Sequence, residues 1–166
     1  MTGPLVVGLG RADRGDDAVG GAVARAVARR VEAAGLPGVL VVEHEDPTAL
    51  LDLWVGRDPV VVVDAVCSGT PPGTVRRLET GARASRLQEG AWSATGRGGT
   101  HAFGLAAAVE LARALHRLPA RLVVVGIEAV GFEYGAPLSG PVAAAVPAAA
   151  EEVVSVLEEV SADVPR

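Results

Sequence analysis

The stretch Pro59-Val60-Val61-Val62-Val63-Asp64-Ala65 decides the fold class through its unbroken apolar run. The same stretch ends that run with a carboxylate. Four consecutive valines favour a β-strand that is covered on both faces, as in the middle of a parallel sheet. A carboxylate at the end of such a strand is costly to bury unless it is paired, strongly hydrogen-bonded or bound to a metal. Asp64 is therefore either a functional residue or an acceptor for amides of the loop that contains Gly69 and Gly73.

On both sides of this strand, strand-length apolar segments alternate with segments of helical period. The alternation predicts an α/β domain with a mainly parallel sheet between helices. Strands are expected at 5–9, 39–43, 59–65, 73–79 and 122–128, the fourth of them at an edge, and helices at 17–34, 48–54, 102–115 and from Ser139 onward, with a long loop at 80–100. The first and third strands are expected to be neighbours, so a site is sought after Leu9 and after Val63.

Length and composition are those of one soluble domain that spans residues 1–166. Charged or turn residues interrupt the apolar runs, so no stretch is expected to insert into a membrane. The start of the chain has no basic segment or cleavage site typical of a secretory signal, and we expect a cytoplasmic protein. The single cysteine, Cys67, cannot form an internal disulfide. A net charge of −5 without a basic cluster argues against nucleic acid as a partner.

Gly8-Leu9-Gly10 follows the first predicted strand and has the start of a dinucleotide-binding pattern. The third glycine of that pattern would fall at position 13, which is Asp13. A pyrophosphate group would then meet acidic side chains where it needs bare backbone amides. The same repulsion disfavours a small-molecule hydrolase or phosphorylase that would use this edge of the sheet.

Arg14-Gly15-Asp16-Asp17 precedes the first predicted helix. Acids at a helix start stabilise it by about 0.3 to 1 kcal/mol each, through the helix dipole and the free amides. One acid is enough for that purpose, and two adjacent acids repel each other unless a cation or an arginine such as Arg14 lies nearby. Capping and function therefore remain equal alternatives for this pair.

His101 follows a glycine-rich segment, residues 96–100, at the start of a predicted helix. The helix dipole disfavours the imidazolium there, and a neutral imidazole is the form that binds metals. The alternative is an ordinary half-buried surface histidine. With Asp17 and Asp64, His101 would complete an oxygen- and nitrogen-rich site for zinc or nickel with open positions. A conventional nucleophile is not indicated, since there is no Gly-x-Ser-x-Gly or His-Glu-x-x-His motif.

Four blocks of the sequence resemble, in the same order, those of hydrogenase maturation proteases, and together they cover nearly the whole chain. The blocks are VGLG at 7–10 with RGDDAVG at 14–20, VDA at 63–65 with PGTV at 72–75, Thr100-His101 with Gly104-Leu105, and GIE at 126–128 with Leu138-Ser139 and Val142. The resemblance implies a three-layer α/β/α fold of the phosphorylase/hydrolase-like type, with a twisted, mostly parallel five-stranded sheet.

The resemblance also assigns site residues. Asp17, Asp64 and His101 match the family's metal-recognition and catalytic set, and Asp16, Asp46 and Thr48 are expected to contact substrate. Two departures stand out: Arg11 replaces the usual Asn, and residues 45–48, EDPT, replace the usual Asp-Gly-Gly-Thr. The second departure affects the choice of precursor.

The activity that the resemblance implies is a single endoproteolytic cut in the large-subunit precursor of a nickel-iron hydrogenase, which removes a short C-terminal extension once nickel is inserted. The nickel is then supplied by the substrate, and no organic cofactor is expected. Hydrolysis would use a metal-polarised carbonyl or a metal-activated water. The alternative is a nickel-binding or chaperone-like module that recognises the same large subunit without cutting it.

Overall fold

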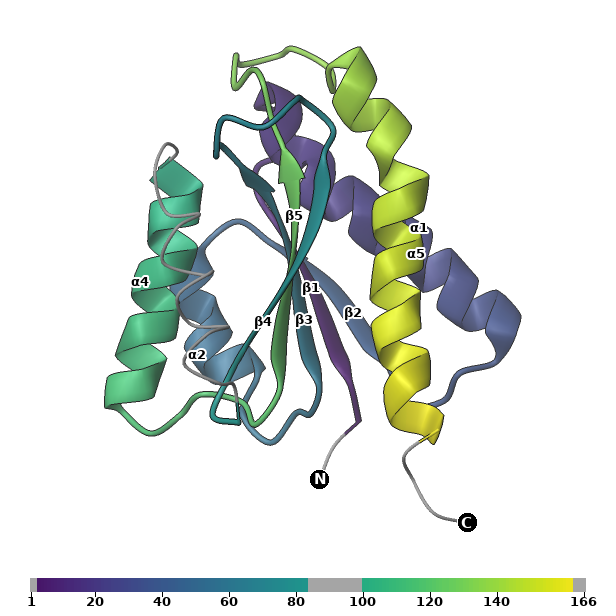
Figure 1. Ribbon diagram of the computed structural model, residues 1–166, viewed down its shortest axis with the longest axis vertical. Helices are drawn as coiled ribbons and strands as arrows, with labels where there is room; N and C mark the ends of the chain where they lie inside the picture. Colours follow the sequence, from purple (N-terminus) through teal and green to yellow (C-terminus); the bar gives the residue numbers. More distant parts are fainter. Residues whose placement is uncertain (1–2, 84–99, 163–166) are drawn as a thin grey trace.

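The computed structural model describes residues 3–83 and 100–162, without the side chains of residues 100–103. Figure 1 shows one sheet between two layers of helices. In chain order the elements are β1 (Leu5–Leu9), η1 (Gly15–Ala18), α1 (Val19–Ala34), β2 (Leu40–His44), η2 (Pro47–Ala49), α2 (Leu50–Leu53), β3 (Val60–Val66), β4 (Val75–Thr80), α4 (Thr100–Ala114), β5 (Leu122–Glu128) and α5 (Gly140–Ala162).

The five strands form a sheet in the order β2-β1-β3-β5-β4. All neighbours are parallel except β4, which is antiparallel to β5 and lies at an edge. This topology confirms the predicted mostly parallel five-stranded sheet, the edge position of the fourth strand and the pairing of the first strand with the third. In such a sheet the carboxyl ends of β1 and β3 open onto one crevice.

The valine run of β3 is buried on both faces because alternate side chains enter different halves of the core. Val61 and Val63 pack with α1 and α5, whereas Val60 and Val62 pack in the half that contains α2 and α4. Successive side chains of a strand point to opposite faces. Asp64 therefore continues the face of Val60 and Val62, on the side of α4.

The first helix begins differently from the prediction. Residues 15–18 form a turn of 3-10 helix, and the α-helix starts only at Val19. Gly35 ends it in the left-handed conformation, with φ 62°. As a result, both acids of the Asp16-Asp17 pair lie in a tight turn in front of α1.

The last helix, α5, is long and apolar enough to cross a membrane by length and composition. The expectation concerned uncharged apolar runs, and Glu151 and Glu152 interrupt the apolar residues of α5. One face of α5 packs in the core beside α1, through residues that include Ala149, Val153 and Leu157. This packing accounts for its apolar residues as those of a core helix.

Candidate active site

Four carboxylates are buried at the carboxyl edge of the sheet. Asp16 and Asp17 lie in η1, Asp64 lies near the end of β3, and Glu128 ends β5. Their exposed fractions are 1%, 0%, 0% and 3%. Because a buried charge needs partners, the hydrogen bonds of each group separate structural acids from candidate catalytic ones.

Asp16 holds the loop that joins β5 to α5. Its carboxylate accepts hydrogen bonds from the amides of Val130, Gly131 and Ser139, at 2.9, 3.2 and 2.7 Å, and from the Ser139 hydroxyl at 2.9 Å. Burial alone would raise the pKa of Asp16, but these bonds outweigh it and lower that pKa. Asp16 thus has a structural role, and a direct contact with substrate stays a prediction.

Glu128 holds the loop between β3 and β4. Its carboxylate accepts bonds from the amides of Ser68 and Gly69, at 2.8 and 2.9 Å, and from the Ser68 hydroxyl at 2.7 Å. These bonds overcome the effect of burial and lower the pKa of Glu128. The alternative in which Asp64 accepts amides of the loop containing Gly69 does not hold, because Glu128 is their acceptor. The only sequence signal that could have pointed to Glu128 is its place in the fourth block of the family resemblance, GIE at 126–128.

Asp17 is completely buried, and its Oδ2 accepts a hydrogen bond from the Arg11 amide at 2.9 Å. The N-cap positions of η1 and α1 are Arg14 and Ala18, and neither makes a side-chain cap. Asp17 instead faces back toward the end of β1, where a Cβ on Gly10 would lie 3.2 Å from its Oδ1. Arg11 contributes its backbone to this contact, which any residue can supply, so its replacement of Asn leaves this bond intact.

The arginines of this segment point elsewhere. Arg11 pairs with the exposed Asp13 at 3.1 Å and lies over the Tyr134 ring. Arg14 donates to the Phe132 carbonyl at 3.2 Å and also contacts the Tyr134 ring. The side chains of Arg11 and Arg14 are thus engaged by Asp13 and by the Phe132 carbonyl. The expectation that Arg14 would neutralise the acidic pair is not supported by these contacts.

Asp64 differs most clearly from the structural acids. Both of its oxygens are buried and have no hydrogen-bond partner among the residues that the structure describes. Burial first, and the Asp17 carboxylate second, raise the pKa of Asp64 well above its ordinary value. The amide of Ala65 opposes this shift without meeting the geometry of a hydrogen bond. Such a group is suited to hold a proton or to accept a cation.

The acidic turn is brought to β3 by a close contact between α1 and the sheet. A Cβ on Gly20 would collide with the carbonyl oxygen of Leu9 and lie 2.7 Å from that of Val63. Only glycine lets the helix approach the ends of β1 and β3 this closely. Gly20 therefore sets the distance between the η1 turn, with Asp17, and Asp64.

His101 lies in the first turn of α4, and its side chain is outside the described residues. One turn later, a Cβ on Gly104 would lie 3.1 Å from Cγ of Pro47, so α4 rests closely on η2. The helix therefore starts beside the turn that contains Asp46 and Thr48. Most of the predicted loop at 80–100, residues 84–99, is also outside the described part.

Asp46 and Thr48 form a local cap. The Asp46 carboxylate accepts bonds from the amide and the hydroxyl of Thr48, at 2.9 and 2.7 Å, and the Asp46 amide donates to Nδ1 of His44 at 3.1 Å. These bonds lower the pKa of Asp46. Both side chains lie at the carboxyl end of β2, and their contact with substrate stays a prediction.

Cys67 is half-buried near the same edge. Burial, followed by the carboxylates of Glu128, Asp16 and Asp64, raises the pKa of the Cys67 thiol. This environment disfavours the thiolate, so Cys67 is a poor nucleophile.

Among the described residues, no group of three or more His, Cys, Asp and Glu side chains could hold a metal ion.

The fold and the site define a class: an α/β enzyme whose buried acids stand at the carboxyl ends of its parallel strands. A family model described as hydrogenase maturation protease matches residues 45–156, which is more than half of the chain. The chain belongs to this family, the hydrogenase maturation proteases. The matched segment contains Asp64 and His101, whereas Asp17 precedes it.

Solved structures agree with the fold. The hydrogenase maturating endopeptidase HybD from Escherichia coli is 24% identical, with 95% of this chain and 93% of that one covered and a TM-score of 0.75. HybD from Thermococcus kodakarensis is 23% identical, with 93% and 98% covered and a TM-score of 0.69. HycI from the same archaeon is 19% identical, with 95% and 93% covered and a TM-score of 0.63. The search of curated proteins found no match.

Proposed function

We propose that this endopeptidase removes the C-terminal extension of a nickel-iron hydrogenase large-subunit precursor after nickel insertion, and that it recognises the nickel carried by that substrate. Family membership supports the protease activity and the link to hydrogenase maturation. The identity of the precursor, the role of nickel and action in the cytoplasm belong to the proposal.

The observation that carries the proposal is the contrast among the four buried carboxylates. Asp16 and Glu128 are fully occupied by loop amides and hydroxyls. Asp64 has two buried oxygens that no described residue satisfies, and the nearby Asp17 carboxylate acts on its pKa. A divalent cation between the two acids would relieve both the burial cost and the repulsion.

The donor set fits nickel. Two carboxylates and one imidazole supply oxygen and nitrogen ligands, which suit borderline divalent metals. Asp64 is on the face of the sheet that α4 covers, and His101 lies in the first turn of that helix. We assign Asp17, Asp64 and His101 to this set, which leaves positions for ligands already held by the substrate.

Hydrolysis in this scheme depends on positioning. Nickel in the substrate fixes the precursor against the carboxyl edge of the sheet, so the peptide bond to be cut is held beside the two acids. Asp64, whose pKa burial and the Asp17 carboxylate raise well above its ordinary value, gains a compensating positive charge when the nickel arrives, and Asp17 can accept a hydrogen bond from an attacking water. The same residues therefore serve recognition and catalysis.

The test compares cleavage of nickel-loaded and nickel-free precursor by mass spectrometry. We expect cleavage of the loaded form only, and a loss of roughly 100-fold or more in Asp17→Asn, Asp64→Asn and His101→Ala. The matched control is Asp13→Asn, which removes an exposed acid from the same segment and should leave cleavage unchanged. Full activity in all three site variants would contradict the assignment.

The same assay separates the enzyme from a module that binds the large subunit without cutting it. Purified protein that shortens the loaded precursor excludes the non-proteolytic alternative. Retained binding of the precursor with no cleavage by the wild-type chain would favour that alternative instead.

A further inference from the structure

A pocket lies at the opposite end of the sheet from the acids. It is formed where α2 leads into β3 and where α4 leads into β5, and it has a volume of about 360 Å³. Asp58, in its wall, precedes β3, whereas Asp64 lies near the end of that strand. At about 3.3 Å per residue the pocket is roughly 20 Å from the carboxylate site, so it is separate from it.

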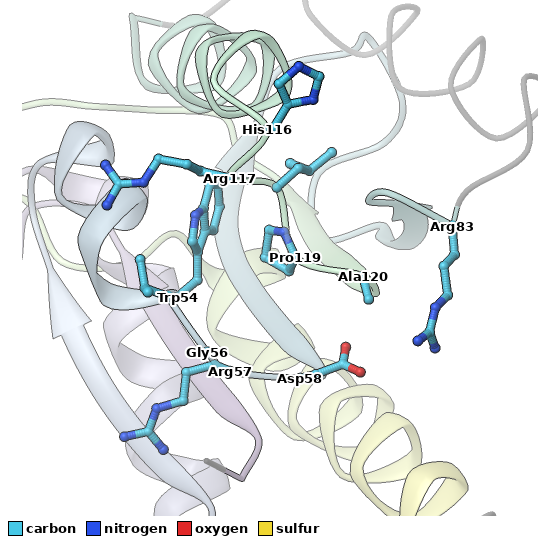
Figure 2. Close-up of a pocket in the computed structure, with 11 residues that line it drawn as sticks. Trp54, Gly56, Arg57, Asp58, Arg83, His116, Arg117, Pro119 and Ala120 are labelled. Carbon is cyan, nitrogen blue, oxygen red and sulfur yellow. The ribbon is translucent and has the colours of Figure 1, made fainter. Parts of the chain in front are cut away.

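The lining of this pocket combines an apolar wall with arginines. Figure 2 shows Trp54 and Pro119 in the wall, with the side chains of Arg57 and Arg117 extending on the Trp54 side and Arg83 on the other side. Three arginines stand against one acid, Asp58, in a chain whose net charge is −5. Positive charge is thus concentrated here against the overall charge.

The fold does not use these cations. Arg57 and Arg83 form no ion pair within the described part of the chain, and Arg117 reaches only the exposed Asp52, at 3.6 Å. The one acid, Asp58, is engaged by the Arg121 amide at 3.1 Å. Guanidinium groups that the fold leaves available are well suited to carboxylates and phosphates.

Trp54 gives a second, independent indication. Its side chain is 1% exposed, and its indole nitrogen is the one buried donor without a hydrogen-bond partner among the described residues. An unsatisfied buried donor costs about 1–3 kcal/mol, so such a group calls for an acceptor. Trp54 lines the pocket, so a ligand bound there would contact this side chain.

We propose that this pocket binds a small organic anion, with a phosphate or carboxylate on the Trp54 side, where Arg57 and Arg117 extend, and an apolar part against Trp54 and Pro119. The volume is that of small-ligand sites, which combine apolar walls with a few polar groups. The turn after α4 that supplies one wall contains His116, which takes a left-handed conformation with φ 54°.

The test is a titration of the full chain with phenyl phosphate, followed by the indole N–H resonance of Trp54. Trp92→Phe assigns that resonance, because the chain has two tryptophans. We expect a saturable shift below about 10 mM, and at least about tenfold weaker binding of inorganic phosphate and of neutral phenol. Phosphate that binds as well as phenyl phosphate would overturn the apolar contact, and phenol that binds as well would overturn the anion site.

Variants make the assignment specific. Arg57→Gln/Arg117→Gln should weaken phenyl phosphate binding about tenfold or more with an unchanged melting temperature. The control, Arg29→Gln/Arg76→Gln, removes two exposed arginines that do not line the pocket and should bind like the wild type. Equal binding by both double variants, or no saturable shift in the wild type, would overturn the proposal.

Discussion

Asp64 and Asp17 meet as two completely buried acids at the carboxyl ends of β3 and β1. Burial, and after it the carboxylate of Asp17, raises the pKa of Asp64 well above its ordinary value. The pair is therefore costly to the fold, whereas the adjoining Asp16 stabilises it. This contrast gives opposite predictions for similar substitutions.

Asp64→Asn should keep or raise the free energy of unfolding at pH 7, by up to about 2 kcal/mol, because the amide removes repulsion from a buried site without changing its volume. Urea denaturation measures this change, and precursor cleavage by the same variant should be lost. A variant destabilised by several kcal/mol would show that the Asp64 carboxylate has a structural partner.

Asp16→Asn should instead destabilise the fold, by about 2 kcal/mol or more, because its carboxylate accepts three amides and a hydroxyl from the β5–α5 loop. Hydrogen exchange should increase first at Val130, Gly131 and Ser139. Ser139→Ala removes only the hydroxyl and is expected to have a smaller effect. Unchanged exchange at these amides would contradict the proposed role of Asp16.

Gly20→Ala should destabilise the chain by about 3 kcal/mol or more, because the added methyl group meets backbone carbonyls that cannot move away. The matched control is Gly21→Ala, in the same helix turn. There the methyl meets only the ends of the Glu43 and Arg25 side chains, and a helical alanine gains about 1 kcal/mol over glycine. Equal stability of the two variants, measured by thermal unfolding, would rule out the close approach of α1 to β1 and β3.

Gly104→Ala should reduce precursor cleavage about tenfold, with little loss of stability, because the methyl pushes the first turn of α4, and His101 with it, away from Pro47. Pro47→Ala removes the Cγ atom that the methyl would meet. The double variant should recover part of the activity lost in Gly104→Ala, which a double-mutant cycle measures. Additive losses would show that the contact does not position α4.

Glu159 gives a pH prediction, because its carboxylate binds Arg77 and Arg121, at 2.8 and 2.7 Å, and these bonds lower its pKa from 4.5 to about 2. As the pH falls, the Glu159 carboxylate is therefore protonated at a higher pH in the unfolded chain than in the folded one. The stabilisation is complete above about pH 4.5 and is lost as the pH falls toward about 2.

Glu159→Gln should therefore lose less stability than the wild type over that pH range, as measured by urea denaturation. The control is Glu158→Gln, an exposed neighbour in α5 that forms no ion pair with either arginine in the described structure. Parallel acid profiles for the wild type and Glu159→Gln would contradict the prediction.

The sheet could be predicted from the sequence because its strands are encoded locally. The four valines of β3 and the run of β5 leave no polar face, so each must lie centrally between two layers. Boundaries shifted by one or two residues where turns compete with strands and helices, as at η1. The family that the sequence blocks indicated was confirmed by the match over residues 45–156, which contains the second, third and fourth blocks.

By itself the sequence determined the fold class, the family and the end of the sheet where the acids gather, since these follow from hydrophobic periodicity and the order of motifs. Only the tertiary structure decided which acids are structural: the amides that occupy Asp16 and Glu128 come from segments far along the chain. The pocket beside Trp54 could not be predicted for the same reason, because its lining residues come from segments far apart along the chain. Long-range contacts fix hydrogen-bond partners, burial and pKa, and a local pattern does not contain them.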